Sequence, residues 1–214
     1  MGDLESAVPR PRVPQQERSR ATQARILDAA VRVLTESGYE GFTTAVVSQR
    51  AEVSKGALFK HFPTRETLLV ATVRHLFEGQ RGNFANALMS LEGQNARERV
   101  RAAIRALWDL LRDPEYLAVL QVYSAARTNA KLASALGPIA EEEAAETHAA
   151  GTLLFTSFGV PPDADVGGLI AVVFYALEGM AQDEGFNGEP TPGYYEQAFR
   201  QLERLVMDLI PEEE

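Results

Sequence analysis

The chain has 214 residues, of which 45% are hydrophobic and 24% are charged, a balance typical of a soluble globular protein. It contains no cysteine, which excludes disulfide bonds and zinc sites built on thiolates. Its 30 acidic and 21 basic residues give a net charge of −9, which argues against a nucleic-acid partner unless the charge is unevenly distributed.

The charge is in fact unevenly distributed along the chain. Residues 1–75 hold 11 basic and 8 acidic side chains, a net charge of +3, whereas residues 76–214 hold 10 and 22, a net charge of −12. The first third of the chain is therefore the part suited to a polyanion. The acidic remainder either repels DNA and so orients the basic part, or serves solubility alone.

The N-terminal segment, residues 1–16, contains Pro9, Pro11 and Pro14 and is predicted to be a disordered tail. An alternative role is a basic arm that reaches into a DNA minor groove. A first helix is expected over residues 17–37, because apolar residues recur there at helical spacing. Gly38 is expected to end it in the left-handed cap position.

Residues 41–62 have the pattern of a helix-turn-helix. Thr43 or Thr44 is placed to cap a short helix that runs to about Ala51, and a tight turn follows. Ser54 is placed to cap a second helix over residues 55–62, which Pro63 ends. The side chains expected to face inward are Val47, Ala51, Val53, Leu58 and Phe62.

The opposite face of the second helix combines cations, an aromatic ring and small residues, which suits the DNA major groove. The residues expected to contact DNA, on this face or beside it, are Thr43, Thr44, Ser54, Lys55, Gly56, Ala57, Phe59, Lys60, His61 and Arg65. The alternative is an ordinary pair of packed helices with a solvated basic face.

The stretch from about residue 20 to residue 75 resembles the DNA-binding head of the tetracycline-repressor (TetR) family of bacterial regulators. The resemblance is carried by residues 38–44, 51–56, 58–62 and 64–69. This sequence departs from the family's frequent pattern with Val47-Ser48 for Ile-Ala, Glu52 for Gly, Phe59 for Tyr and Arg65 for Lys. The resemblance implies a homodimeric regulator, usually a repressor, whose body binds a small-molecule effector.

The rest of the chain is predicted to be helical. Asn95 with Glu98 forms a capping box, and Asp113-Pro114 is a strong helix start. The expected helices are 64–91, one opened by Asn95, 114–127, 131–136, 138–158, 164–181 and 194–210, with a loop over 183–193. The predicted fold is therefore all-α, with a helix-turn-helix domain over 17–62 and an effector-binding and dimerisation domain over 63–214.

Residues 164–181 are apolar nearly all round, which predicts a helix buried on every side, partly by the body and partly by a second copy of the chain. The homodimer is expected to form through residues 164–181 and 194–210, with Val173 and Phe199 among the contacts. The longest apolar run, 166–177, is too short to span a bilayer, and no signal peptide is visible. A cytoplasmic protein is expected.

Aromatic and polar groups of the body are candidates to line an effector pocket, although core packing also explains each of them. They are Trp108, Tyr116, Tyr123, Arg127, His148, Phe155, Phe174 and Tyr175. The three histidines lie far apart without partners at metal-ligand spacing, and no phosphate loop or nucleophilic triad is evident. We therefore expect no enzyme, metal or cofactor. The rival hypothesis is a helical small-molecule-binding or interaction protein that does not bind DNA.

Overall fold

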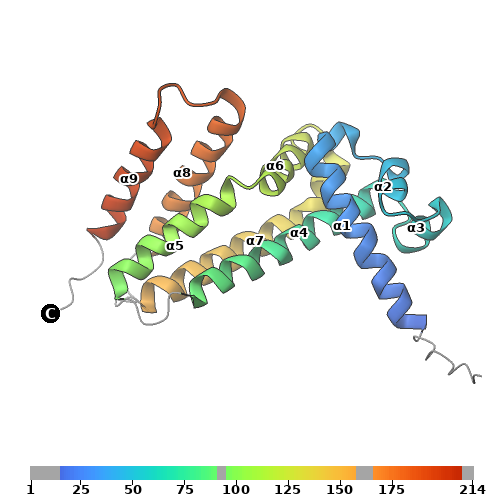
Figure 1. Cartoon of the computed structure of the whole chain (residues 1–214), viewed down its shortest axis with the longest axis horizontal. Helices are drawn as coiled ribbons and strands as arrows, with labels where there is room; N and C mark the ends of the chain where they lie inside the picture. The colour runs from blue at the N-terminus through green and yellow to red at the C-terminus, as the bar shows by residue number, and fades with distance from the viewer. Residues whose placement is uncertain (1–14, 91–94, 158–165, 209–214) are drawn as a thin grey trace, which may run out of the picture.

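The computed structural model describes residues 15–90, 95–157 and 166–208, and every regular element in these ranges is an α-helix. The helices are α1 (Gln15–Gly41), α2 (Thr44–Arg50), α3 (Lys55–His61), α4 (Arg65–Met89), α5 (Ala96–Leu111), α6 (Pro114–Ala126), α7 (Ala130–Ser157), α8 (Val166–Asn187) and α9 (Tyr194–Met207). Figure 1 shows α2 and α3 at one end of the molecule, α8 and α9 at the other, and α4 and α7 running between them. The all-α prediction is confirmed.

Helix α1 begins at Gln15, so residues 15 and 16 belong to a helix rather than to the predicted tail, while residues 1–14 lie outside the described residues. Gly38 interrupts α1 with φ 63° and ψ −174°, a conformation that side chains with a Cβ rarely adopt. The helix therefore stops where the sequence predicts. It resumes for three further residues, to Gly41, before α2 begins.

Helix α4 is the long connection between the two ends. It opens with a capping box, in which the Thr64 hydroxyl accepts from the Thr67 N–H at 3.0 Å and Thr67 Oγ1 accepts from the Thr64 N–H at 3.0 Å. It then continues through Gly79 and Gly82 to Met89 as one helix of 25 residues. The predicted end at Leu91 lies outside the described residues.

Helix α7 corrects the prediction of two helices, over 131–136 and 138–158. It is one helix of 28 residues that contains Pro138 in its interior. Proline removes one backbone hydrogen bond, but Leu132, Leu136 and Ile139 are all buried on this part of the helix. The burial of these side chains on both sides of Pro138 offsets the lost bond, and tertiary packing here overrides the local stop signal.

Helix α8 is longer than predicted, and one of its faces is exposed in the single chain. It runs to Asn187, across part of the expected loop, and ends at Gly188 with φ 67°. Val173 is buried, but Val172 is 62% exposed and Tyr175 is 65% exposed, so the helix is not buried on every side within one chain. By length and composition alone α8 could cross a membrane, and 28% of its most apolar window is buried. The predicted start of this helix at residue 164 lies outside the described residues.

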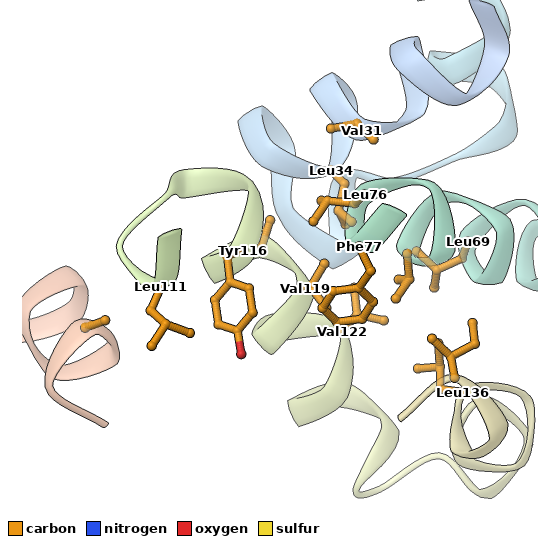
Figure 2. Close-up of a cluster of buried hydrophobic side chains, with 14 of the residues drawn as sticks. Val31, Leu34, Leu69, Leu76, Phe77, Leu111, Tyr116, Val119, Val122 and Leu136 are labelled. Atoms are coloured by element: carbon orange, nitrogen blue, oxygen red, sulfur yellow. The ribbon is translucent and has the colours of Figure 1, made fainter. Parts of the chain in front are cut away.

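One continuous core connects the two ends of the molecule. Figure 2 shows Val31 and Leu34 of α1 beside Leu76 and Phe77 of α4, with Tyr116 of α6 on the other side of Phe77. The Phe77 and Tyr116 rings meet edge to face at 6.4 Å. The helix that carries the helix-turn-helix therefore packs directly on the helices of the body.

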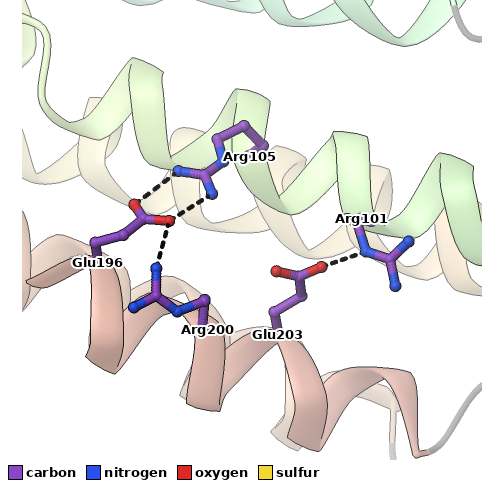
Figure 3. A network of polar contacts seen from close by, with 5 residues as sticks. All are labelled: Arg101, Arg105, Glu196, Arg200 and Glu203. Carbon is purple, nitrogen blue, oxygen red and sulfur yellow. Dashed lines mark hydrogen bonds and ion pairs between the residues drawn. The ribbon is translucent and has the colours of Figure 1, made fainter.

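Helix α9 is attached to α5 by an ion network and an aromatic contact. Arg105 of α5 donates to both carboxylate oxygens of Glu196 at 3.1 and 3.2 Å, and Arg101 pairs with Glu203 (Figure 3). Phe199 is completely buried against Trp108, with ring centroids 6.0 Å apart. Phe199 therefore belongs to the core of one chain, and not to the surface predicted to meet a second copy.

Helix α9 has a buried side and an apolar side chain that faces solvent. Tyr195 and Val206 are buried, whereas Leu205 is 64% exposed. Leu209 and the predicted end at Ile210 lie outside the described residues. The apolar surface that α8 and α9 leave uncovered in one chain is thus made by different residues from those predicted.

Candidate DNA-binding interface

The helix-turn-helix is built from two short helices, each capped by the predicted hydroxyl. Thr43 Oγ1 accepts from the Val46 N–H at 3.2 Å at the start of α2, and Ser54 Oγ accepts from the Ala57 N–H at 3.1 Å at the start of α3. These bonds satisfy backbone donors that have no partner inside the helix. Between the two helices, Glu52 adopts φ 54°, a left-handed conformation that the chain enters without a glycine.

The inner side of this unit is apolar, as predicted. Val47, Ala51, Leu58 and Phe62 are buried, and Val53 is half-buried against them. Ser48 is also buried, and its hydroxyl donates to the Ala45 carbonyl at 2.9 Å. A serine is therefore accommodated at this packed position because it bonds to the carbonyl of its own helix.

The outer side of α3 presents the predicted reading face. Lys55, Gly56 and Lys60 are exposed, and Phe59 is 44% exposed, while Ala57 and His61 are half-buried at the margin. Of the flanking residues, Thr43 and Ser54 are exposed and Thr44 is half-buried. Two cations, an aromatic ring and a position without a side chain thus lie together on one solvent-facing surface of one short helix.

Arg65 has a different environment from the one predicted. Its Nε donates to the Phe42 carbonyl at 2.7 Å, and one terminal nitrogen donates to the Tyr39 carbonyl at 2.7 Å. The other terminal nitrogen donates to the Tyr39 hydroxyl at 3.1 Å, and the guanidinium lies 4.4 Å from the centre of the Tyr39 ring. The structure therefore places this guanidinium inside the head, where it joins the start of α4 to the turn that follows α1.

A second link joins α1 to α2. The two terminal nitrogens of Arg50 donate to the two carboxylate oxygens of Glu36 at 2.9 and 2.6 Å. The hydrogen bond from Arg50 holds the pKa of the Glu36 carboxyl below its usual value. Because both side chains are largely exposed, this pair contributes to the orientation of the helices more than to stability.

The eight candidate pocket residues of the body have different degrees of exposure. Trp108 and Phe155 are buried, Phe174 is half-buried and packs edge to face on Tyr175, and Arg127 and His148 are exposed. None of the eight lines either of two surface grooves, one between α1, α4 and α6 and the other between α5 and α9. In the same part, no three His, Asp or Glu side chains are arranged to hold a metal ion.

Two tyrosines of α6, both among those candidates, have contrasting surroundings. The Tyr116 hydroxyl donates to Glu178 of α8 at 2.5 Å, whereas the buried Tyr123 hydroxyl has no hydrogen-bond partner among the described residues. Burial raises the pKa of Tyr123 to about 12, and burial together with Glu178 raises the pKa of Tyr116 further. The sequence identified both rings but offered no signal that one of them lacks a partner.

Tyr39 and Arg50 are the residues of this region that sequence reasoning missed. Each is joined to a partner across the tertiary structure, Tyr39 to Arg65 and Arg50 to Glu36. Neither spacing matches a local motif, since the partners are 26 and 14 residues apart. Only the assembled head shows that these four side chains join three helices.

Comparison with known proteins agrees with this geometry. Residues 26–72 match the family of bacterial regulatory proteins described as the tetR family. An uncharacterised HTH-type transcriptional regulator of Mycobacterium tuberculosis is 29% identical over 192 residues, which are 90% of this chain and 96% of that protein. The HTH-type transcriptional repressor KstR of Mycolicibacterium smegmatis is 37% identical over 62 residues, 29% of this chain and 30% of that protein.

Among solved structures, the multidrug binding protein EbrR, complexed with imidazole, superposes with a TM-score of 0.60 at 23% identity over 100% of this chain and 99% of that one. At this identity the likeness supports the fold of head and body together. The sequence matches identify the helix-turn-helix and extend over most of the chain. We conclude that the chain belongs to the tetR family of bacterial regulatory proteins and is a DNA-binding transcriptional regulator.

Proposed function

We propose that this regulator is a homodimeric repressor that binds double-stranded operator DNA through the outer face of α3 and is released by a small-molecule effector. DNA binding by α3 is supported by the solvent-facing group of Lys55, Phe59 and Lys60 on this capped helix. Such a helix enters the major groove with its side chains toward base edges, while flanking groups contact phosphate. Gly56 lets the backbone approach closely.

The two proposed domains differ in charge as well as in function. Residues 17–62 carry the reading unit within the basic first third, and residues 63–214 carry the acidic body that takes the effector and the second copy. The buried Tyr123 hydroxyl has no partner among the described residues, and this supports a ligand among the helices of the body, since such a group costs about 1–3 kcal/mol unless something satisfies it. EbrR, complexed with imidazole, is a neighbour of the same fold that binds a small molecule.

The proposed homodimer forms through the exposed apolar side chains of α8 and α9. Val172 and Tyr175 of α8 are 62% and 65% exposed, and Leu205 of α9 is 64% exposed. A second copy would cover them by two-fold pairing of the same helices and would explain why α8 has an uncovered apolar face. We propose a cytoplasmic protein without enzymatic activity, in keeping with relatives named as regulators.

The test of DNA reading is the operator affinity of Lys60→Ala, measured by fluorescence anisotropy with DNA from the protein's own upstream region. Lys60 is exposed at the end of α3, so its removal leaves the fold intact. A lost base contact weakens binding by about 1–3 kcal/mol and relaxes sequence preference, whereas a lost phosphate contact lowers the salt dependence. Phe59→Ala removes the neighbouring apolar contact and is expected to weaken binding as well.

The matched control is Arg204→Ala, which removes one positive charge from α9, distant from α3 in Figure 1. It is expected to leave operator affinity unchanged. If Lys60→Ala and Phe59→Ala both bind operator like the unmodified protein at several salt concentrations, the outer face of α3 does not read DNA. Equal losses in Lys60→Ala and Arg204→Ala would instead indicate an effect of net charge alone.

A further inference from the structure

A groove of about 510 Å³ lies where the head meets the body. Helix α1 contributes Asp28 and Val31 to its lining, α4 contributes residues from His75 to Asn83, and α6 contributes Glu115. Its volume is in the range of small-molecule sites, which is about 300–1,000 Å³. The groove thus touches the helix that supports the reading unit, the long connecting helix and a helix of the body at once.

The floor of the groove is apolar and its walls are acidic. Val31 and Leu76 are buried beneath it, and Gly79 has no heavy atom within 4 Å of the position that a Cβ would take, so the space above it is open. Asp28, Glu78 and Glu115 bring one carboxylate from each of the three helices. Apolar surface bounded by carboxylates suits a ligand that combines a hydrocarbon part with positive charge.

The charge around the groove is negative even after its cations are counted. Arg32 lines the groove, and His75 Nε2 lies 3.0 Å from Asp28 Oδ1. Three carboxylates against one guanidinium leave a formal charge of about −2 on the acidic and arginine side chains of the lining. In the described part of the chain the acidic side chains do not approach closely enough to hold a metal ion, so the geometry favours a larger cation with dispersed charge.

Gln80 is a second polar feature of the groove, independent of its carboxylates. It lines the groove, and both its amide oxygen and its amide nitrogen are buried without a hydrogen-bond partner among the described residues. Native proteins satisfy the large majority of such atoms, because each unsatisfied one costs about 1–3 kcal/mol. An ammonium group that donates to the oxygen, directly or through water, would remove part of this cost, and a water molecule could accept from the amide nitrogen.

We infer that this groove is a binding site for a small organic cation, an aliphatic amine or diamine, that bridges α1, α4 and α6. The ammonium groups pair with the carboxylates of Asp28, Glu78 and Glu115, and the hydrocarbon part covers Val31 and Leu76. The site is separate from the candidate pocket residues of the body, none of which lines it. Because the ligand contacts α1 and α4 together, its binding fixes the orientation of the reading unit relative to the body.

The binding test is a calorimetric titration of the full chain with 1,5-diaminopentane, without DNA. Gly79→Leu fills the groove from its open floor, and it is expected to weaken binding about tenfold or more. Gly82→Leu is the matched control, since Gly82 lies on the same helix with equally open space and does not line the groove. Both substitutions favour helix, so α4 is preserved.

Glu115→Gln is a second variant that changes charge without filling space. It is expected to weaken diamine binding about fivefold, the effect of one exposed ion pair. The uncharged 1,5-pentanediol is expected to bind far more weakly than the diamine. Diol binding that equals diamine binding would overturn the cation assignment, and equal losses in Gly79→Leu and Gly82→Leu would overturn the location.

The consequence for DNA rests on the proposed function and is measured separately. Saturating diamine is expected to change operator affinity in the unmodified protein and not in Gly79→Leu, and operator DNA changes diamine affinity by the same factor. Binding without such a change would leave the site in place and reject its coupling to DNA. Absence of diamine binding in a protein that still binds operator rejects the site alone.

Discussion

The reading unit and the body differ in how completely their polar groups are hydrogen-bonded and their apolar groups are buried within one chain. In the head, Thr43 and Ser54 cap their helices, and Arg65 makes three hydrogen bonds and a ring contact. In the body, the Tyr123 hydroxyl and the Gln80 amide are buried without partners among the described residues. Apolar side chains of α8 and α9 also face solvent there.

This difference is what the partners proposed for each part would require. DNA presents phosphates and base edges to an exposed surface, so the head is complete before it binds and leaves only its outer face free. A small molecule or a second copy of the chain is enclosed by the groups it satisfies, so those groups remain unsatisfied until it arrives. Changes in the body should therefore reveal absent partners, and changes in the head should reveal internal contacts.

The largest expected effect is on assembly. Tyr175→Glu places a charge on the exposed apolar face of α8, and a charge buried there without a partner costs several kcal/mol of dimer stability. Light scattering of the unmodified protein should give twice the chain mass of 23.4 kDa, and the variant should give one chain mass.

Met89→Glu is the control for assembly, because Met89 is 66% exposed on α4, outside the two helices of the proposed interface. It should remain a dimer. A mass near 23.4 kDa for the unmodified protein at micromolar concentration would contradict the proposed interface. Val173 is unsuitable for this test, because it is buried within one chain and a charge there unfolds the protein.

The next largest effect is expected at Arg65. Arg65→Ala removes three hydrogen bonds of a half-buried guanidinium and should lower the free energy of unfolding by about 2–3 kcal/mol. Arg65→Lys keeps the charge but lacks the planar group that spans Tyr39 and Phe42, so it should recover only part of this loss. Chemical denaturation of both variants measures the difference.

Operator binding separates this positioning role from a direct phosphate contact. If Arg65 acts through the head, Arg65→Ala lowers stability, and the salt dependence of binding is kept in the fraction that remains folded. A variant of unchanged stability with a reduced salt dependence would return Arg65 to the DNA surface, where the sequence placed it.

Local patterns explain most of what the sequence predicted. The caps at Thr43, Ser54 and Asn95 each involve a bond across three residues, so composition and spacing are sufficient to identify them. The Arg65 contacts span 23 and 26 residues and follow from the assembled head. Pro138 within α7 also escaped prediction, because packing on other helices decides whether the helix continues there.

A smaller contrast is expected between the two tyrosines of α6. Tyr116→Phe removes the bond to Glu178 and should destabilise the protein by about 1–2 kcal/mol. Tyr123→Phe removes a buried hydroxyl that has no partner among the described residues, and should stabilise the effector-free protein by about 1 kcal/mol. Thermal unfolding should therefore shift in opposite directions, and a loss of stability in both would mean that Tyr123 has a bound partner.

The same pair predicts how stability changes in alkali. An unfolded tyrosine loses its proton near pH 10, whereas burial raises the pKa of Tyr123 to about 12 in the folded protein. The pH-dependent contribution of this tyrosine to the free energy of unfolding is fully present below pH 10. It is lost as pH rises from 10 toward 12, at about 1.4 kcal/mol per pH unit for each such tyrosine. Tyr123→Phe should make this decline shallower, and an unchanged decline would contradict the assignment.

The smallest effect is expected in the turn between α2 and α3. Glu52 adopts φ 54° there, and an L-residue in this region costs about 1–2 kcal/mol relative to glycine. Glu52→Gly relieves that cost but gives the unfolded chain more freedom, so the expected net gain is about 0.5–1 kcal/mol.

Gly38, with φ 63°, offers the reverse substitution, because an added Cβ is strained there and lies 2.9 Å from Gln121 Oε1. Chemical denaturation should show a higher midpoint for Glu52→Gly and a lower one for Gly38→Ala. If Glu52→Gly is less stable than the unmodified protein, an interaction of the glutamate side chain stabilises the turn by more than the left-handed backbone conformation costs.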